Sequence, residues 1–397
     1  MGYQVMNVDS APVKVEAIPS EDGIVTPNQS ISTVLSDRTC DQISGSLVGG
    51  AVGDALGGAV EFMSLLEIKA KFGPQGITAY AQAYGRVGAI TDDTQMTLFT
   101  AEGLIHAYIR ASLRGMVSIT SIVNLAYLRW LHTQGLKSKV ASRNVEGGGW
   151  LLQQKELFSN RAPGQTCISA LKEMSRLSTE RANNNSKGAG GIMRIAPVAM
   201  MFAGRLSEGS QVFKFAKEAA WLTHGHPTGY LSAGAFAVVL HGLLCGHSIL
   251  EGVEIARLIL KSEANSTETL RSIDLAISLA LDQRSNEEAI TTLGEGWVAD
   301  EALGIALYCA LTAKDFSDGL QNAVNHDGDS DTTGSLVGQL LGAICGFSKI
   351  PTKWLTDLEI RELILSVADD ICKHESWDLD YMSDGYNSAI VQRYIGG

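Results

Sequence analysis

Two acidic segments hold the residues whose types and spacing could do chemistry. One reads Thr91-Asp92-Asp93 and the other Asp329-Ser330-Asp331-Thr332, and each enters an apolar stretch with helical spacing. A single segment of this kind needs no function, because threonine and aspartate cap helices and acids complement the helix dipole. Two such segments are harder to explain in this way, and Asp327 adds a third acid that alternates with Asp329 and Asp331. Carboxylates this close repel one another unless a cation or protons neutralise them. Oxygen ligands alone fit Mg²⁺, Mn²⁺ or Ca²⁺ rather than zinc.

Two known motifs use similar strings, and the sequence argues against both. A calcium-binding EF-hand loop starting at Asp327 needs Gly at its sixth position and Glu at its twelfth, where this chain has Thr332 and Gly338. Residues 329–333 also match the Asp-x-Asp-x-Thr nucleophile string of haloacid-dehalogenase-like phosphatases. That string needs an apolar strand directly before it, and the residues there are polar with a helical pattern. The phosphatase is kept as a distant alternative.

Helices must position these acids, because helical spacing of apolar residues dominates the chain. The segments with this spacing are 41–59, 94–112, 117–134, 193–203, 210–223, 228–247, 301–313 and 334–347. Connections between them are rich in Gly, Ser and Asn, and alternating strand patterns are almost absent. The sequence therefore predicts an all-α bundle in one domain, over residues 39–397.

Two of these segments carry a glycine at every fourth position. The two sets are Gly45, Gly49, Gly53 and Gly57, and Gly334, Gly338, Gly342 and Gly346. Glycine costs about 1 kcal/mol per helix position relative to alanine, so the repeat needs a structural reason. A glycine face lets two helix backbones approach closely. We expect the two helices to be central and tightly packed, which would bring Asp54 and Asp329 into one neighbourhood.

The first 38 residues differ from the rest of the chain. They contain three prolines and scattered Ser and Thr, without an amphipathic period. This composition predicts an extended arm. Such an arm is either simply tolerated or a partner-binding segment that becomes ordered on contact.

Composition excludes several functional classes. The 397 residues carry a net charge of −12, which argues against broad binding to nucleic acids or anionic membranes. No uninterrupted apolar run reaches the length of a membrane span, and there is no basic, apolar leader at the N-terminus. Six cysteines lie far apart without a CxxC pair. We expect them to be buried free thiols, in a reducing, cytoplasmic compartment.

Five motifs in order resemble the ADP-ribosylglycohydrolase family, which contains dinitrogenase-reductase-activating glycohydrolase and the ADP-ribosylhydrolases. They are Gly53-Asp54-Ala55-Leu56-Gly57 through Glu61-Phe62, Thr91-Asp92-Asp93-Thr94-Gln95-Met96, Gly188-Ala189-Gly190-Gly191-Ile192-Met193-Arg194-Ile195-Ala196-Pro197, Thr223-His224, and Asn325-His326 through Gly328-Asp329-Ser330-Asp331-Thr332. Together they cover about residues 41–348. The resemblance implies a compact orthogonal helical bundle.

The resemblance also implies a site with two Mg²⁺ ions, for which Mn²⁺ can substitute. Its ligands would be Thr91, Asp92, Asp93, Asp329, Asp331 and Thr332. Backbone contacts to ADP-ribose would come from Gly188, Gly190, Gly191 and Met193, with His224 beside the ligand and Glu61 over the ribose. Proton transfer would fall to Asp92, Asp329, Asp331 or Glu61. Many family members have Gly-Asn-Gly where this chain has Gly188-Ala189-Gly190, so that asparagine's contact is lost or supplied by Asn185 or Ser186.

The function implied is magnesium-dependent hydrolysis of the bond between ADP-ribose and a modified protein side chain, with arginine as the first acceptor to test. Such an enzyme reverses ADP-ribosylation and could serve as an immunity protein against an ADP-ribosylating toxin. The alternative is a stoichiometric inhibitor that binds an ADP-ribosyltransferase through residues 1–38. The two roles can coexist in one chain.

Overall fold

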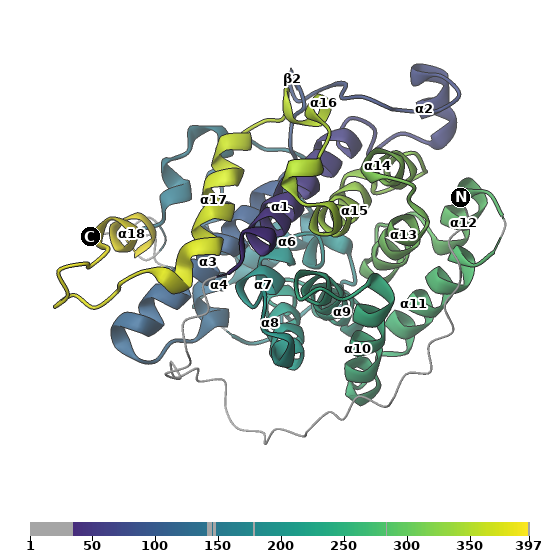
Figure 1. Cartoon of the computed structure of the whole chain (residues 1–397). Helices are drawn as coiled ribbons and strands as arrows, with labels where there is room; N and C mark the ends of the chain where they lie inside the picture. Colours follow the sequence, from purple (N-terminus) through teal and green to yellow (C-terminus); the bar gives the residue numbers. More distant parts are fainter. Residues whose placement is uncertain (1–34, 141–144, 146–147, 178, 283, 396–397) are drawn as a thin grey trace.

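The computed structural model describes residues 35–140, 145, 148–177, 179–282 and 284–395. Helices make up almost all of the regular structure in this part of the chain, so the all-α prediction is confirmed (Figure 1). The one sheet among these residues is an antiparallel hairpin of β1 (Gln82–Ala83) and β2 (Arg86–Val87). Residues 1–34 of the predicted arm lie outside the described residues. The first helix begins at Asp37, where the Ser36 hydroxyl accepts a hydrogen bond from the Thr39 amide.

The helices follow one another along the chain with short connections. The α-helices are α1 (Asp37–Gly57), α2 (Leu65–Phe72), α3 (Asp92–Arg114), α4 (Ile119–Thr133), α6 (Gln165–Glu173), α7 (Ala196–Met201), α8 (Gly209–Trp221), α9 (Pro227–Leu244), α10 (Ile249–Ser262), α11 (Thr267–Ala280), α12 (Asn286–Leu293), α13 (Ala299–Thr312), α14 (Phe316–Val324), α15 (Ser330–Cys345), α16 (Thr352–Leu355), α17 (Arg361–Lys373) and α18 (Ser388–Ile395). The 3₁₀ turns are η1 (Trp150–Gln153), η2 (Lys155–Leu157), η3 (Ala189–Gly191), η4 (Leu206–Glu208), η5 (Phe347–Lys349) and η6 (His374–Ser376).

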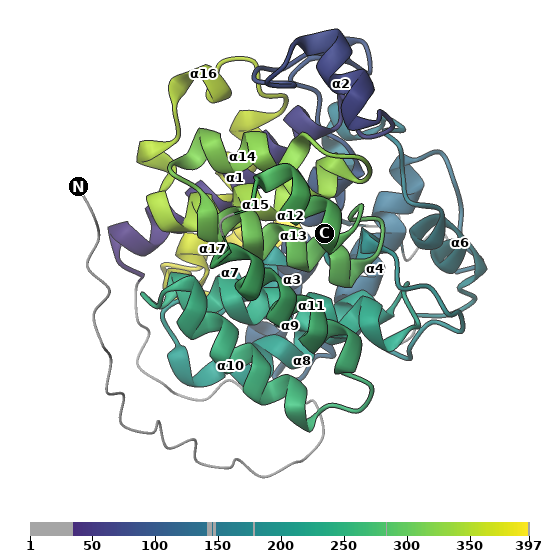
Figure 2. The same cartoon turned by 90° about the vertical axis from the view of Figure 1, so that its right-hand side faces the viewer.

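The antiparallel pair α1 and α15 forms the centre of the molecule (Figures 1 and 2). Their glycines face each other so closely that a Cβ at Gly49 would lie 2.3 Å from the carbonyl oxygen of Gly338. A Cβ at Gly53 would lie 1.9 Å from the carbonyl oxygen of Gly334. No side chain fits at these distances, so only glycine permits this contact. The predicted close packing is confirmed, and it places the end of α1 beside the start of α15.

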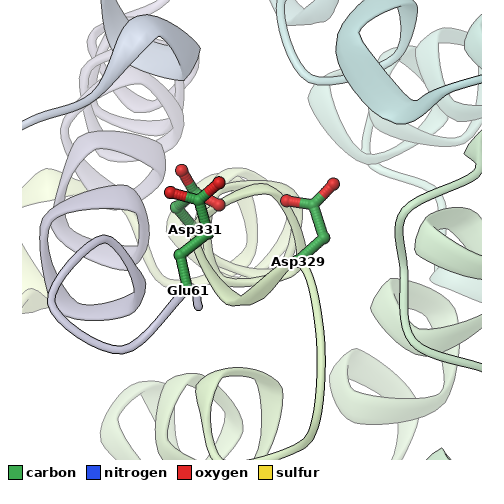
Figure 3. A group of neighbouring side chains, drawn as sticks. All are labelled: Glu61, Asp329 and Asp331. Carbon is green, nitrogen blue, oxygen red and sulfur yellow. The ribbon is translucent and has the colours of Figure 1, made fainter. Parts of the chain in front are cut away.

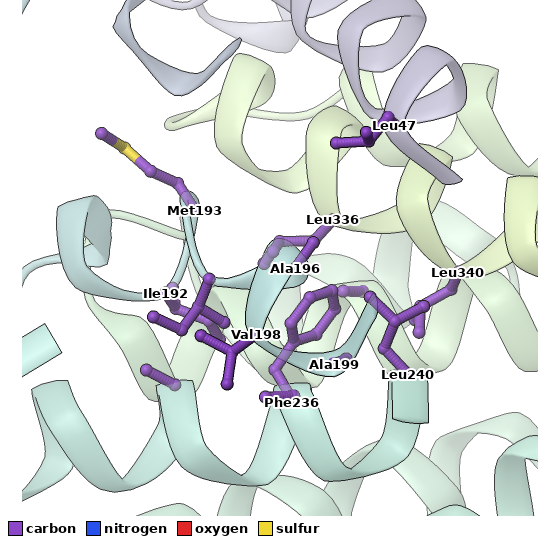
Figure 4. Packing of buried hydrophobic residues seen from close by; sticks show 14 of the residues in the cluster. Leu47, Ile192, Met193, Ala196, Val198, Ala199, Phe236, Leu240, Leu336 and Leu340 are labelled. Atoms are coloured by element: carbon purple, nitrogen blue, oxygen red, sulfur yellow. The ribbon is translucent and has the colours of Figure 1, made fainter. Parts of the chain in front are cut away.

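The hydrophobic core surrounds this pair. Figure 4 shows Phe236 and Leu240 of α9 packed near Val198 of α7 and near Leu336 and Leu340 of α15. Among the described residues, α9 alone is long and apolar enough to cross a membrane, and 89% of its 18-residue window is buried inside the protein. Burial of this kind is typical of a central helix in a globular core.

The region around the glycine-rich motif departs from the predicted helix 193–203. The chain first makes the 3₁₀ turn η3, and α7 begins only at Ala196. Pro197 near the start of α7 explains the boundary, because proline fits the first turn of a helix and cannot lie in its interior. The six cysteines are all free thiols, although only Cys167 and Cys309 are fully buried.

Candidate active site

Six buried carboxyl groups meet where α1 ends and where α3 and α15 begin. We call this group the acidic centre, and its members are Asp54, Glu61, Asp92, Asp93, Asp329 and Asp331. None is more than 7% exposed. Carboxylate oxygens of Glu61, Asp329 and Asp331 lie within 4.8 Å of one another, and Figure 3 shows Glu61 and Asp331 side by side with Asp329 beyond them. The sequence predicted that these segments meet, and the structure brings them together.

Burial and mutual repulsion shape the electrostatics of the acidic centre. Burial raises the pKa of Asp92, Asp93 and Asp329 well above the usual range, and the charge of Asp331 raises it further. The same two causes raise the pKa of Glu61 to about 11 and that of Asp54 to about 7. No Lys or Arg in the described residues forms an ion pair with any of the six. Such a group holds either protons or a bound cation.

Asp54 fixes the start of α3. Its carboxylate accepts hydrogen bonds from the amide of Thr91, 3.0 Å to each oxygen, and from the amide of Thr94 at 3.1 Å. The Thr94 hydroxyl also donates to Asp54. Amides in the first turn of a helix have no partner within the helix, so an acid placed there both satisfies and orients them. The sequence predicted the neighbourhood of Asp54 but not this role.

A buried ion pair holds the same turn from the other side. Arg161 donates to both carboxylate oxygens of Glu359 at 3.0 and 3.1 Å and to the Ile90 carbonyl at 3.0 Å. Glu359 in turn accepts from the Ile90 amide at 3.1 Å. The Arg161 carbonyl accepts from the Asp92 amide at 3.2 Å. The residues just before Asp92 are therefore clamped between Asp54 and this ion pair, which no sequence motif indicated.

At the start of α15, one of the three alternating acids leaves the site. Asp327 is exposed, and its carboxylate accepts a hydrogen bond of 2.7 Å from the Leu65 amide at the start of α2. Asp329 and Asp331 remain buried at 7% and 2% exposure. The expected repulsion within this segment therefore involves two acids rather than three.

The donors of the acidic centre fit hard divalent cations. Oδ1 of Asp93 and Oε2 of Glu61 are buried without a hydrogen-bond partner. The Thr91 hydroxyl hydrogen-bonds Asp331 and the Thr332 hydroxyl hydrogen-bonds Asp329, and each contact lowers the pKa of the acid it touches. All the donors are oxygens, the set that Mg²⁺ and Mn²⁺ prefer. The predicted ligands Thr91, Asp92, Asp93, Asp329, Asp331 and Thr332 thus lie at the start of α3 or at the start of α15.

The predicted substrate-binding glycines lie in one turn over His224. A Cβ at Gly190 would lie 2.9 Å from Sγ of Cys167 and 3.2 Å from Cε1 of His224, and a Cβ at Gly191 would lie 3.3 Å from Nδ1 of His224. Burial and the Arg194 charge lower the pKa of His224 to about 3, so its ring is neutral. The Thr223 hydroxyl lies 2.8 Å from its Nδ1. His224 supports the turn, and glycine there keeps the backbone close to the ring.

This glycine-rich turn is tied to the helices of the acidic centre. The Met193 carbonyl accepts hydrogen bonds of 3.4 Å from the Thr97 hydroxyl on α3 and from the Gln339 amide on α15. The Met193 side chain is buried, at 3% exposure, and belongs to the hydrophobic core (Figure 4). The Ser186 hydroxyl accepts a hydrogen bond of 3.3 Å from the Gly188 amide. Asn185 is exposed.

An all-helical enzyme with a buried acidic centre beside a glycine-rich turn is the class that fold and site define. A family model described as ADP-ribosylglycohydrolase matches residues 35–379, so this chain belongs to that family of hydrolases. The phosphatase alternative lacks its strand, because α14 precedes Asp329 and the hairpin is the only sheet in the described residues.

Several known proteins are similar in sequence to this chain over most of their own length. ADP-ribosyl-[dinitrogen reductase] glycohydrolase of Rhodospirillum rubrum is 26% identical, covering 81% of this chain and 91% of its own. ADP-ribosylarginine hydrolase Tri1 of Serratia proteamaculans is 23% identical, and the match covers 85% of this chain and 81% of that protein. ADP-ribosylhydrolase ARH3 of Homo sapiens is 27% identical, and the match covers 57% of this chain and 71% of that protein. A solved ADP-ribosylglycohydrolase-related protein complex has the same fold, with a TM-score of 0.58 and 24% identity over 86% of this chain and all of the other.

Proposed function

We propose that this protein hydrolyses the bond between ADP-ribose and a modified arginine side chain, with two Mg²⁺ ions held by the acidic centre. The observation that carries the proposal is the group of six buried carboxyl groups without a basic partner in the described chain. The names of the relatives from Rhodospirillum rubrum and Serratia proteamaculans support ADP-ribose linked to a protein as the substrate, and the second supports arginine as the acceptor.

The ligands proposed for the cations are Thr91, Asp92, Asp93, Asp329, Asp331 and Thr332. When bound, Mg²⁺ would lower the pKa of a water and fix the ribose hydroxyls. The remaining tasks belong to the chain itself. The glycine-rich turn presents backbone to the ADP-ribose, and neutral His224 beneath it adds no charge. The Asp54 and Arg161–Glu359 contacts hold the start of α3 in place.

We assign proton transfer to Glu61. This residue follows α1 in a turn rather than in a helix, and its neighbour Phe62 is 73% exposed, so Glu61 lies where the acidic centre meets the surface. In the reaction a water oxygen bonds to the anomeric carbon as the carbon–nitrogen bond breaks, and a proton passes to the leaving guanidine nitrogen. A carboxyl group at the mouth of the site can transfer that proton between water and the leaving group.

The test compares ADP-ribosyl-arginine, ADP-ribosyl-serine and O-acetyl-ADP-ribose, each with Mg²⁺ and with a chelator. We expect ADP-ribose release from the arginine compound, and loss of that release when the cation is removed. Release that continues at the same rate in chelator would rule out the metal assignment. Release of ADP-ribose from ADP-ribosyl-serine or O-acetyl-ADP-ribose, without release from ADP-ribosyl-arginine, would rule out arginine as the acceptor.

A further inference from the structure

A cavity lies next to the loop that precedes α15. It has a volume of about 440 Å³ and is bounded by the end of α12, the loop 294–298, the start of α13 and residues 326–327. The loop that lines it contacts the acidic centre, because the Asp329 amide donates a 2.8 Å hydrogen bond to the carbonyl of Glu295. A ligand in this cavity would therefore lie near the acidic centre.

The lining of this cavity carries negative charge only. Glu295, Glu301 and Asp327 line it, and no Lys or Arg is among its lining residues. His326 contributes no positive charge, because its two ring nitrogens lie 2.7 Å from the Asp327 carbonyl and 2.9 Å from the Thr333 hydroxyl, and burial lowers its pKa. Three carboxylates around one opening favour a cationic occupant.

The carboxylates of Glu301 and Asp327 also accept hydrogen bonds from backbone amides of the described chain, whereas the Glu295 carboxylate does not. Glu301 accepts hydrogen bonds from the amides of Glu295 and Gly296 at 3.1 and 3.2 Å, and Asp327 caps α2 through Leu65. The Glu295 carboxylate is exposed and has no hydrogen-bond or ion-pair partner among the described residues. Glu295 is thus the acid whose charge can be changed without breaking a contact.

An exposed aromatic pair joins the cavity to the mouth of the site. Trp297 lines the cavity and is 40% exposed, and Phe62 stacks against it with ring centroids 6.2 Å apart and planes 20° apart. Phe62 directly follows Glu61 in the sequence. Aromatic faces attract guanidinium and ammonium groups. This pair is an observation independent of the three acids, and it favours the same kind of occupant.

We infer that this cavity binds an arginine or lysine side chain that flanks the modified residue on the protein substrate. The inference rests on the proposed function and specifies its substrate: ADP-ribosylated segments with basic neighbours. The ADP-ribose would occupy the glycine-rich turn, the modified side chain would pass Glu61, and a basic neighbour would enter between Trp297 and Glu295. The carboxylates of Glu295, Glu301 and Asp327 select a basic side chain of the substrate by charge complementarity.

The experiment measures hydrolysis of two ADP-ribosylated peptides that differ only in having Arg or Gln beside the modified arginine, and of ADP-ribosyl-arginine alone. The enzymes are wild type, Glu295→Lys and the control Asp384→Lys. Asp384 is an exposed acid shortly before α18, and its substitution changes the net charge equally. Figure 1 shows α18 at the opposite side of the molecule from α12. Wild type and control should prefer the Arg peptide about tenfold in kcat/KM. Glu295→Lys should lose this preference through KM, with kcat kept.

The three substrates separate the possible failures. An equal preference for the Arg peptide in Glu295→Lys and wild type overturns the inference, as does no preference in wild type, while the proposed function stands. If Glu295→Lys is equally impaired on ADP-ribosyl-arginine, the residue acts on the ADP-ribose and the inference is also overturned. If wild type cleaves none of the three, the proposed function itself fails. A melting temperature within about 2 °C of wild type shows that the variant is folded.

Discussion

Among the six carboxyl groups of the acidic centre, Asp331 has the greatest electrostatic effect on the others. After burial, its negative charge is the leading cause of the raised pKa of Asp54, Glu61, Asp92, Asp93 and Asp329. A group that disturbs every neighbour in this way is costly for the fold unless a positive charge faces it. This cost supports the proposal that the protein binds cations here.

Replacing Asp331 with Asn should therefore raise the stability of the metal-free protein and lower the activity of the protein in Mg²⁺. Without divalent ions, the variant should melt at least about 2 °C above wild type, because one buried like charge is gone. With Mg²⁺, wild type should gain stability and the variant should gain little, while turnover falls at least about a thousandfold. Melting curves in chelator and in Mg²⁺ measure both effects. Asp384→Asn is the control, since Asp384 is exposed and lies shortly before α18, outside the centre. A lower melting point for Asp331→Asn in chelator would contradict the argument.

The Arg161–Glu359 pair yields a second prediction for single residues. Arg161→Met should destabilise the protein by about 3 to 5 kcal/mol, because it leaves Glu359 buried without its main partner. Arg86 also contacts Glu359, at 3.2 Å, but its side chain is 44% exposed. Arg86→Met should thus cost about 1 kcal/mol or less. Urea unfolding of the two variants gives the comparison, and equal losses would show that the buried pair is no clamp.

The sequence predicted the acids at this site more easily than the residues that support them. Consecutive and alternating aspartates at helix starts are a visible pattern, and the resemblance placed Glu61, His224 and the glycines with them. Arg161 and Glu359 gave no such signal, because they lie 198 residues apart and become partners only through the fold. Asp327 was grouped with Asp329 and Asp331 by spacing alone, yet the backbone turns it toward α2. Spacing along the chain does not report side-chain direction in a loop.

At the level of elements, the contact between α1 and α15 depends on backbone-to-backbone distance. Gly49→Ala would place a Cβ 2.3 Å from the Gly338 carbonyl, and should destabilise the protein by about 3 kcal/mol despite the better helix propensity of alanine.

The matched control for this prediction is Gly209→Ala at the start of α8. Its Cβ would lie 3.6 Å from Cγ2 of Ile255, an ordinary van der Waals contact. Chemical denaturation should show a smaller loss for this variant than for Gly49→Ala. Similar losses for the two would mean that the close approach of the backbones is not what the glycines provide.

The long helices that the periodicity predicted have ends within a few residues of the predicted ones, and the exact ends are set by contacts that a periodicity does not contain. α3 begins at Asp92 rather than at 94 because Thr91 and Asp54 cap it. α15 begins at Ser330 rather than at 334. In the described part of the chain, six helices of four to nine residues were not assigned, because so short a helix holds too few apolar positions to show a period; they are α2, α6, α12, α14, α16 and α18. The longer helices α10, α11 and α17, of 13 or 14 residues, were also missed.

At the level of the whole molecule, buried histidines link stability to pH. Burial lowers the pKa of His106 and of His374 to about 4. Both rings are neutral when folded, whereas in the unfolded chain they take up a proton near pH 6.5. Their contribution to stability is present above pH 6.5 and is lost as pH falls toward 4.

His106→Leu should reduce this loss. Both ring nitrogens of His106 are buried without a hydrogen-bond partner, so leucine breaks no contact of that kind. Relative to pH 7.5, the variant should retain on the order of 2 kcal/mol more stability than wild type at pH 5. Melting temperatures at the two pH values measure the difference. If wild type and variant lose the same amount, another group is responsible.

The pairing of α1 with α15 also determines when the enzyme can become active during translation. Asp92 and Asp331 are more than two hundred residues apart, so the ribosome releases four of the six carboxyl groups of the acidic centre long before the other two exist. Until α15 emerges, the glycine face of α1 has no helix to contact, and its bare backbone stays open to water or to a chaperone. A nascent chain that stops before residue 329 therefore carries one set of acids and no counterpart, which makes catalytic competence a property of the finished polypeptide.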